Sequence, residues 1–158
     1  MPFTYPPFYD VQTPVGNGAP NQDPDVMLVQ YFLFSIYIDE GWPLPFGPEP
    51  PDDVSDAGAI QPIDGVASPD LGKWISAFQA FANDNGLGTL QVDGIVSHGG
   101  AAWGHVKPRA ANWSAIHAMN HVLFLSNKER FWSLPSDPSV PAPLQEEMAF
   151  VVNIDPVP

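Results

Sequence analysis

The stretch PIDGVASPDLGKWISAFQ, residues 62–79, contains a tight-turn signal, a helix start and an amphipathic helix in direct succession. Asp64-Gly65 supplies the positive backbone torsions that a tight turn needs. Ser68 stands at the N-cap position and Pro69 at the first helical position. Apolar residues then recur at helical spacing, at Leu71, Trp74, Ile75, Phe78 and Ala82. The stretch therefore predicts a turn followed by a helix that packs one face on a core and ends at Asn85-Gly86.

The chain nearly repeats this stretch. QVDGIVSHGG (91–100) carries a second Asp-Gly pair, Asp93-Gly94, and NWSAIHAMN (112–120) ends in an apolar residue followed by an amide, as ISAFQ does. The first apolar run offers a third such pair, Val29-Gln30. The repetition indicates one structural unit used more than once.

The amides of the repeat have a physical role. An amide beside a core donates and accepts at once, so it can bond the backbone of a tight turn packed against its helix. We expect Gln30, Gln79 and Asn120 to act in this way, each turn being held by the amide of the helix that follows it.

Three segments of the chain are distinguished by composition. Residues 1–24 form an extended Pro-rich arm whose aromatic residues, Phe3, Tyr5, Phe8 and Tyr9, we expect to lie on this domain's own surface or on a neighbouring copy. Residues 25–132 form the domain, and residues 133–158 a linker and a C-terminal strand.

Regular elements are expected at several places in addition to the helix of the opening stretch. The long apolar run from Asp25 to before Gly41 predicts a central helix, and residues 90–96 predict a short strand or hairpin around Asp93-Gly94. Residues 112–125 predict a third helix with Ile116, Met119 and Leu123 inward. The stretch EEMAFVVNI, ending at Ile154, is rich in strand formers and predicts a strand.

These motifs resemble the peptidoglycan-binding-domain-like family over about residues 25–125. The matching pieces are Val29-Gln30, then Asp64-Gly65 with ISAFQ, then Asp93-Gly94-Ile95 with IHAMN. The resemblance implies a mainly α fold with a compact three-helix core, and a surface that holds cell-wall glycan. The chain departs from the family pattern in a long loop before Asp64 and in extra residues between Gly94 and the third helix, so the fold carries over more safely than the ligand.

The charge balance excludes some partners. The chain has 5 Lys+Arg against 18 Asp+Glu, a net charge of −13. Nucleic acids and anionic membranes are attracted by cationic side chains, so neither is expected as a partner. Neutral sugars, cationic groups, divalent ions and other proteins remain open.

The sequence also indicates where in or outside the cell we expect the protein to be made and to act. There is no Cys, so disulfides and thiolate metal sites are excluded. The N-terminus lacks the pattern of a secretory signal. The longest apolar run is about 13 residues, too short for a membrane span. We expect synthesis in the cytoplasm and action as part of a virion or other extracellular particle.

Catalytic and metal-binding signals are weak. His117 and His121 are four residues apart on a predicted helix, which makes them candidate metal ligands, but the H-E-x-x-H motif is absent. The carboxylates of Asp64 and Asp93 are explained by their turns, and no nucleophile elbow or phosphate-binding loop is present. We therefore expect neither an enzyme nor a cofactor.

Aromatic side chains in loops are the better candidates for binding. A flat ring stacks on sugar faces or anchors a protein partner. Trp42 and Phe46 lie in one inserted loop, and Trp103 and His105 in the other. These four residues are the expected glycan or partner contacts.

Two functions follow from these features. The favoured one is a non-catalytic assembly protein of a virion, injection device or filament, with arms that bind copies of itself or other particle proteins. The alternative is a glycan-binding module that attaches to peptidoglycan through the face between the second and third helices.

Overall fold

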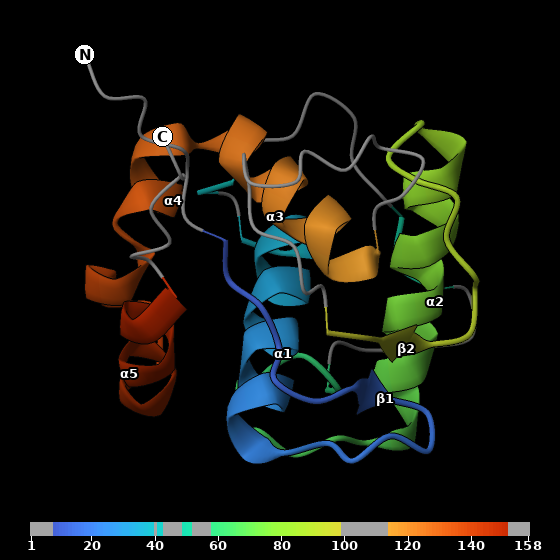
Figure 1. Ribbon diagram of the computed structural model, residues 1–158, viewed down its shortest axis with the longest axis horizontal. Coiled ribbons are helices and arrows are strands. Elements are labelled where there is room, and N and C mark those ends of the chain that lie inside the picture. Colours follow the sequence, from blue (N-terminus) through green and yellow to red (C-terminus); the bar gives the residue numbers. More distant parts are fainter. Residues whose placement is uncertain (1–7, 40, 43–48, 52–57, 99–113, 152–158) are drawn as a thin grey trace, which may run out of the picture.

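The computed structural model describes residues 8–39, 41–42, 49–51, 58–98 and 114–151. The chain is mainly helical with one small antiparallel sheet, which confirms the predicted fold class at this level (Figure 1). In chain order the elements are β1 (Val15–Gly16), α1 (Asp23–Tyr37), α2 (Pro69–Asp84), β2 (Ile95–Val96), α3 (Ala115–Ser126), α4 (Lys128–Trp132), a 3-10 turn (Leu134–Ser136) and α5 (Ala142–Val151). Within the described residues, every helix is too short or too polar to cross a bilayer.

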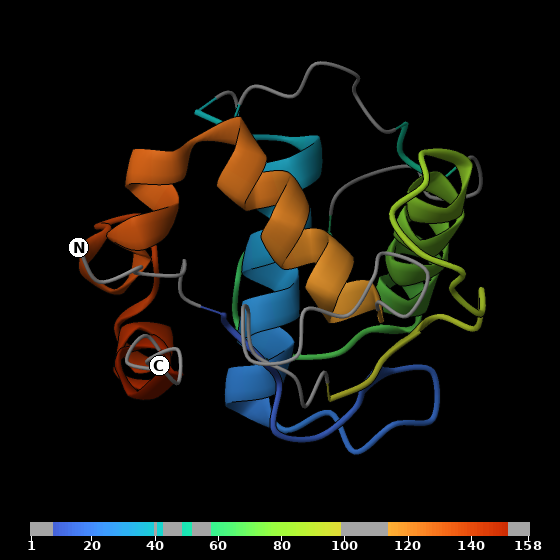
Figure 2. The same ribbon diagram turned by 45° about the horizontal axis from the view of Figure 1, so that its top comes forward.

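Helix α1 is the centre of the molecule, as its apolar composition predicts. It lies between α5 and α2 and also contacts α3 (Figures 1 and 2). Val26, Val29 and Phe32 on α1 are fully buried. Asp25, expected as the N-cap, lies inside the helix instead. Its carboxylate accepts hydrogen bonds from the backbone N–H groups of Gln12 and Thr13, at 2.8 and 3.1 Å, and so ties the N-terminal segment to α1.

Helix α2 begins and ends as predicted. Pro69 is its first residue, although the Ser68 hydroxyl at the N-cap makes no capping hydrogen bond. At the other end the N–H of Gly86 donates to the Asn83 carbonyl and the N–H of Leu87 donates to the Ala82 carbonyl, at 3.3 and 2.8 Å. Together with a φ of 70° at Gly86 this is a Schellman motif.

The five predicted core residues of α2 are all buried, and so are the three inward residues predicted for α3, namely Ile116, Met119 and Leu123. The periodicity of both helices therefore identified their core faces. Packing of the two helices on each other and on α1 follows from these faces.

A strand is present in the region predicted, residues 90–96, but it does not pair locally to form a hairpin. β2 pairs with β1, so that Val15 lies opposite Val96 and Gly16 opposite Ile95. The N-terminal segment thereby enters the core, where Phe8, Tyr9, Val11 and Val15 are buried. Of the two places expected for the aromatic residues of the arm, packing on this domain is the one observed for Phe8 and Tyr9, because burial removes their apolar surface from water. The boundary drawn at residue 24 does not separate these residues from the core of the domain.

The predicted C-terminal strand is wrong for residues 146–151, and residues 152–154 lie outside the described part of the chain. Residues 142–151 form α5, and the preceding segment includes a 3-10 turn. Leu144 and Met148, one helical turn apart, are both buried on the side that meets α1. The N–H groups of Leu144 and Gln145 both donate to the Pro141 carbonyl at 2.9 Å, which starts the helix.

Candidate functional site

The first Asp-Gly turn is held by Gln30 of α1. Its side-chain oxygen accepts the N–H of Gly65 at 2.9 Å, and its NH₂ group donates to the carbonyls of Ala59 and Val66, each at 3.1 Å. The NH₂ group also donates to the Asp64 carboxylate. The Val66 N–H and then Gln30 lower the pKa of Asp64, because both stabilise its charged form.

The second Asp-Gly turn is held in the same way by Gln79 of α2. The Gln79 oxygen accepts the N–H groups of Asp93 and Gly94 at 3.1 and 3.0 Å. Its NH₂ group donates to the Asp93 carboxylate and to the Ile95 carbonyl at 3.1 and 3.0 Å. Gly65 and Gly94 have φ values of 76° and 73°, which confirms the predicted torsions.

The predicted order of the pairs was wrong. Each turn is bonded by the amide of the helix that precedes it, since Gln30 meets the turn at Asp64 and Gln79 meets the turn at Asp93. The chain leaves a helix and folds back across that helix before it starts the next one, which brings the turn over the earlier amide.

Asn120 holds the N-terminal segment, not a turn. Its oxygen accepts the N–H of Tyr9 and its NH₂ group donates to the Tyr9 carbonyl, both at 2.9 Å. The Tyr9 hydroxyl donates to the Phe131 carbonyl at 2.8 Å, and burial raises the pKa of Tyr9. The prediction that Asn120 locks a turn is therefore wrong, although the amide makes the same kind of paired bonds to a segment 111 residues away.

Of the predicted contact and arm residues, the structure describes three, and all three are buried. Trp42 is only 2% exposed and packs under the Arg130 guanidinium, 4.7 Å from its ring centre, so its assignment as a surface contact is wrong. Phe8 and Tyr9 are core residues and not a free assembly arm. The remaining predicted residues lie outside the described part of the chain: Phe3, Tyr5, Phe46, Trp103 and His105.

Arg130 of α4, which covers the Trp42 ring, also pairs with two carboxylates. Burial alone would lower the pKa of Arg130, but the carboxylates of Asp137 and Asp39, at 2.8 and 3.1 Å, raise it. Arg130 also donates to the Ser139 hydroxyl at 3.0 Å. The guanidinium therefore ties the end of α1, the loop at Trp42 and the segment before α5 together.

Two of the described histidines, His98 and His117, have structural partners. His117 Nδ1 accepts the N–H of Ser114 at 3.2 Å in a capping box at the start of α3, and its ring stacks on Phe8 with the centres 4.9 Å apart. Burial lowers the pKa of His121. His98 Nδ1 lies 2.8 Å from the Asp10 carboxylate. Over the part of the chain that the structure describes, three metal-ligating side chains nowhere converge.

A polar groove lies between α2 and the N-terminal end of α3, two elements that Figure 1 shows next to each other. Its volume is about 190 Å³. Its polar lining comes from α2, the stretch around the second turn and the α3 N-cap: Gln79, Thr89, Gln91, Asp93, Ser97 and Ser114. Apolar atoms of Leu90, Ile95 and Ala115 complete it.

The groove is suited to a neutral polar group. Thr89, Gln91 and Ser97 are exposed and carry hydroxyl or amide groups, which both donate and accept. Asp93 is the one carboxylate among the described lining residues, and its Oδ1 is occupied by Gln79 and by the N–H of Ile95. Nothing in the sequence marks Thr89, Gln91 and Ser97 as groove residues except their position beside a predicted turn.

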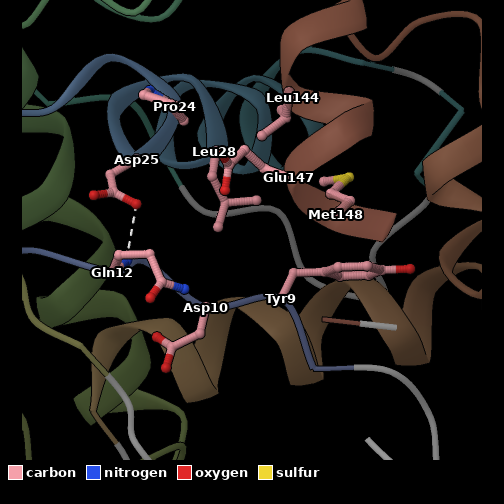
Figure 3. A pocket seen from close by; sticks show the side chains of 9 residues that line it. All are labelled: Tyr9, Asp10, Gln12, Pro24, Asp25, Leu28, Leu144, Glu147 and Met148. Carbon is pink, nitrogen blue, oxygen red and sulfur yellow. Dashed lines mark hydrogen bonds between the residues drawn. The ribbon is translucent and has the colours of Figure 1, made fainter. Parts of the chain in front are cut away.

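A second pocket lies between the N-terminal segment, α1 and α5, and Figure 3 shows the side chains that line it. Its lining includes the acidic residues Asp10, Asp25 and Glu147. Its volume is about 20 Å³, room for roughly one water molecule. A sugar ring or a peptide side chain does not fit there, so the groove beside α3 is the candidate site.

Comparison of the chain with protein-family models, with curated proteins and with solved structures finds no match.

Proposed function

We propose that this protein is a non-catalytic glycan-binding module in which the groove between α2 and α3 holds a sugar unit of a neutral polymer. The observation that carries the proposal is the lining of the groove by exposed hydroxyl and amide groups. Hydroxyls and amides pair with sugar hydroxyls and N-acetyl groups by neutral hydrogen bonds. At about 190 Å³ the groove is smaller than the pockets of about 300–1,000 Å³ that enclose whole ligands, so it fits one unit of a longer chain.

The resemblance to the peptidoglycan-binding-like family supports the same conclusion. The groove occupies the face between the second and third helices on which that resemblance places wall glycan. Gln79 and Asp93, the second of the amide and Asp-Gly pairs on which the resemblance rests, bond to each other and line the groove. Peptidoglycan is therefore the first ligand to test.

The proposal is one of binding without cleavage. Glycosidic bond hydrolysis by acid–base chemistry uses two carboxyl groups across the bond. Among the described groove residues Asp93 alone carries one, and that carboxylate is engaged in holding the turn.

The test is a pull-down on insoluble peptidoglycan and on chitin, a neutral polymer of N-acetylglucosamine. We expect the protein to be retained by at least one of them. A triple variant, Thr89→Ala/Gln91→Ala/Ser97→Ala, should bind at least about tenfold more weakly, since each neutral hydrogen bond contributes about 1 kcal/mol.

The control is Gln22→Ala, which removes an exposed amide outside the groove. This variant should bind like the unmodified protein. Equal binding by the triple variant, or no retention on either polymer, would refute the groove as a glycan site.

A second candidate function is assembly of copies of this chain into a larger particle. Exposed apolar side chains support it: Leu125 is 57% exposed, and Ile38 and Trp132 are each 38% exposed. All three lie near the junction of α1, α3 and α4 that Arg130 and Asp39 hold together. Under this proposal size-exclusion chromatography gives species larger than a monomer, and Leu125→Glu returns them to monomers; a monomer at all concentrations would exclude it.

A further inference from the structure

We propose that Asn17 is a site of spontaneous deamidation that converts this residue to aspartate or isoaspartate in the folded protein. Asn17-Gly18 forms an exposed turn directly after β1, closed by the N–H of Ala19 donating to the Gly16 carbonyl at 3.2 Å. Gly18 has a φ of 67°, and a Cβ added there would meet nothing within 4 Å. The backbone around the Gly18 nitrogen is therefore uncrowded.

The chemistry needs only water and base. The backbone nitrogen of Gly18 loses its proton and attacks Cγ of Asn17, a new C–N bond forms and ammonia leaves, which gives a five-membered succinimide. Water then opens the ring at either carbonyl, to aspartate or to isoaspartate. The net change is one water consumed and one ammonia released, without oxidation or reduction.

The structure leaves this nucleophile available. Among the described residues, none accepts a hydrogen bond from the N–H of Gly18. Glycine at this position also lacks the Cβ that would hinder approach of its nitrogen to the neighbouring side chain.

The chain contains a second Asn-Gly pair, Asn85-Gly86, which serves as an internal comparison. It is exposed too, but the N–H of Gly86 donates to the Asn83 carbonyl in the Schellman motif that ends α2. The NH₂ group of Asn85 donates to Phe81 at 2.8 Å, a shorter bond than the 3.3 Å from Asn17 to the Asp93 carbonyl. We infer that Asn17 reacts while Asn85 is protected by the fold.

Deamidation of Asn17 would change its contacts with the second Asp-Gly turn, Asp93-Gly94. The Asn17 side chain lies against Gly72 of α2 and Gly94 of the turn, so that a Cβ on either glycine would collide with it. Its NH₂ group donates to the Asp93 carbonyl, and its backbone N–H donates to Gly94 at 3.1 Å. A carboxylate has no proton to donate and faces a carbonyl oxygen instead, and isoaspartate adds a methylene to the backbone.

A consequence for ligand binding follows only if the proposed function holds, because Asp93 lines the groove. Glycan retention should then fall as Asn17 converts. The chemical conversion itself is measured by mass and does not depend on that function.

The experiment is a time course of the purified protein in mildly alkaline buffer, read by peptide mapping with mass spectrometry. One sample is native and a matched sample is unfolded in urea. We expect both Asn-Gly pairs to convert in urea, and Asn17 to convert well ahead of Asn85 in the native sample. Incorporation of ¹⁸O from labelled water marks the new carboxyl oxygen.

Gly18→Ala supplies a second readout, since the added methyl group hinders the attacking nitrogen. Conversion at Asn17 should fall to the level seen at Asn85. If Asn17 converts no faster than Asn85 in the native protein, the inference is wrong, and the native time course gives that answer whether or not the variant folds.

Discussion

At the scale of single residues, three amide side chains hold this molecule together. Gln30, Gln79 and Asn120 are each almost completely buried, and each bonds both N–H and C=O groups of another segment. A buried amide that loses its partners leaves backbone groups unsatisfied, which costs more than the bond itself contributes. Stability should therefore depend strongly on these three positions.

Gln79→Leu tests this dependence. The substitution leaves the buried N–H of Gly94 without an acceptor, so we expect the free energy of unfolding to fall by about 2–3 kcal/mol, measured by urea denaturation. Gln91→Leu is the matched control, since Gln91 is exposed, and it should change stability by less than about 0.5 kcal/mol. Equal effects of the two changes would contradict the role of the amide.

The sequence predicted these amides but not their partners. Asp-Gly spacing and the repeated apolar–amide pair were enough to identify Gln79 as a turn lock. Whether the lock acts on the turn before or after its helix depends on the path of the chain in space, which local sequence does not specify. The groove residues Thr89 and Ser97 went unrecognised for the same reason.

At the scale of elements, helix ends with explicit stop signals were predictable and ambiguous apolar runs were not. Helix α2 has Pro69 at its start and Gly86 after its end, and both ends were placed correctly. Residues 146–154 combine strand-forming residues with no Gly or Pro inside the run. That composition led to the prediction of a strand. The helical signal is the spacing of Leu144 and Met148, which mark the buried face of α5.

The Schellman motif gives a prediction at this scale. Gly86→Ala places a Cβ on a residue with φ of 70°, so the free energy of unfolding should fall by about 1–2 kcal/mol. Gly86→Asn should cost less, because asparagine adopts left-handed conformations more readily. A Cβ at Gly86 meets no atom within 4 Å, so any loss reflects backbone conformation and not a clash. Equal stability of all three proteins in thermal unfolding would refute it.

At the scale of the whole molecule, stability should decrease as the pH falls below neutral. The fold lowers the pKa values of His121, Asp64 and Asp137. The cause is burial for His121 and hydrogen bonding for Asp64. For Asp137, burial raises the pKa, but bonds from Ser139 and Arg130 outweigh it. The unfolded chain then binds more protons than the folded one, so acid favours unfolding.

The loss of stability on acidification should occur in two stages. The first begins below about pH 6.5, where His121 becomes protonated in the unfolded chain, and the second below about pH 4, where the carboxylates do. Urea unfolding in a series of buffers measures both. His121→Gln should remove the first stage and leave the second; an unchanged first stage would contradict the assignment.

The bond between Asn120 and Tyr9 also sets a limit on the order of folding. Phe8 stacks on His117, and Tyr9 bonds to Asn120 and to Phe131, partners that are made much later in the chain. Contacts so far apart in sequence slow folding, because a long loop must close before they form. During synthesis these apolar side chains therefore stay uncovered until residues 117–131 have been made, and this is the interval in which the nascent chain is most open to aggregation or to a chaperone.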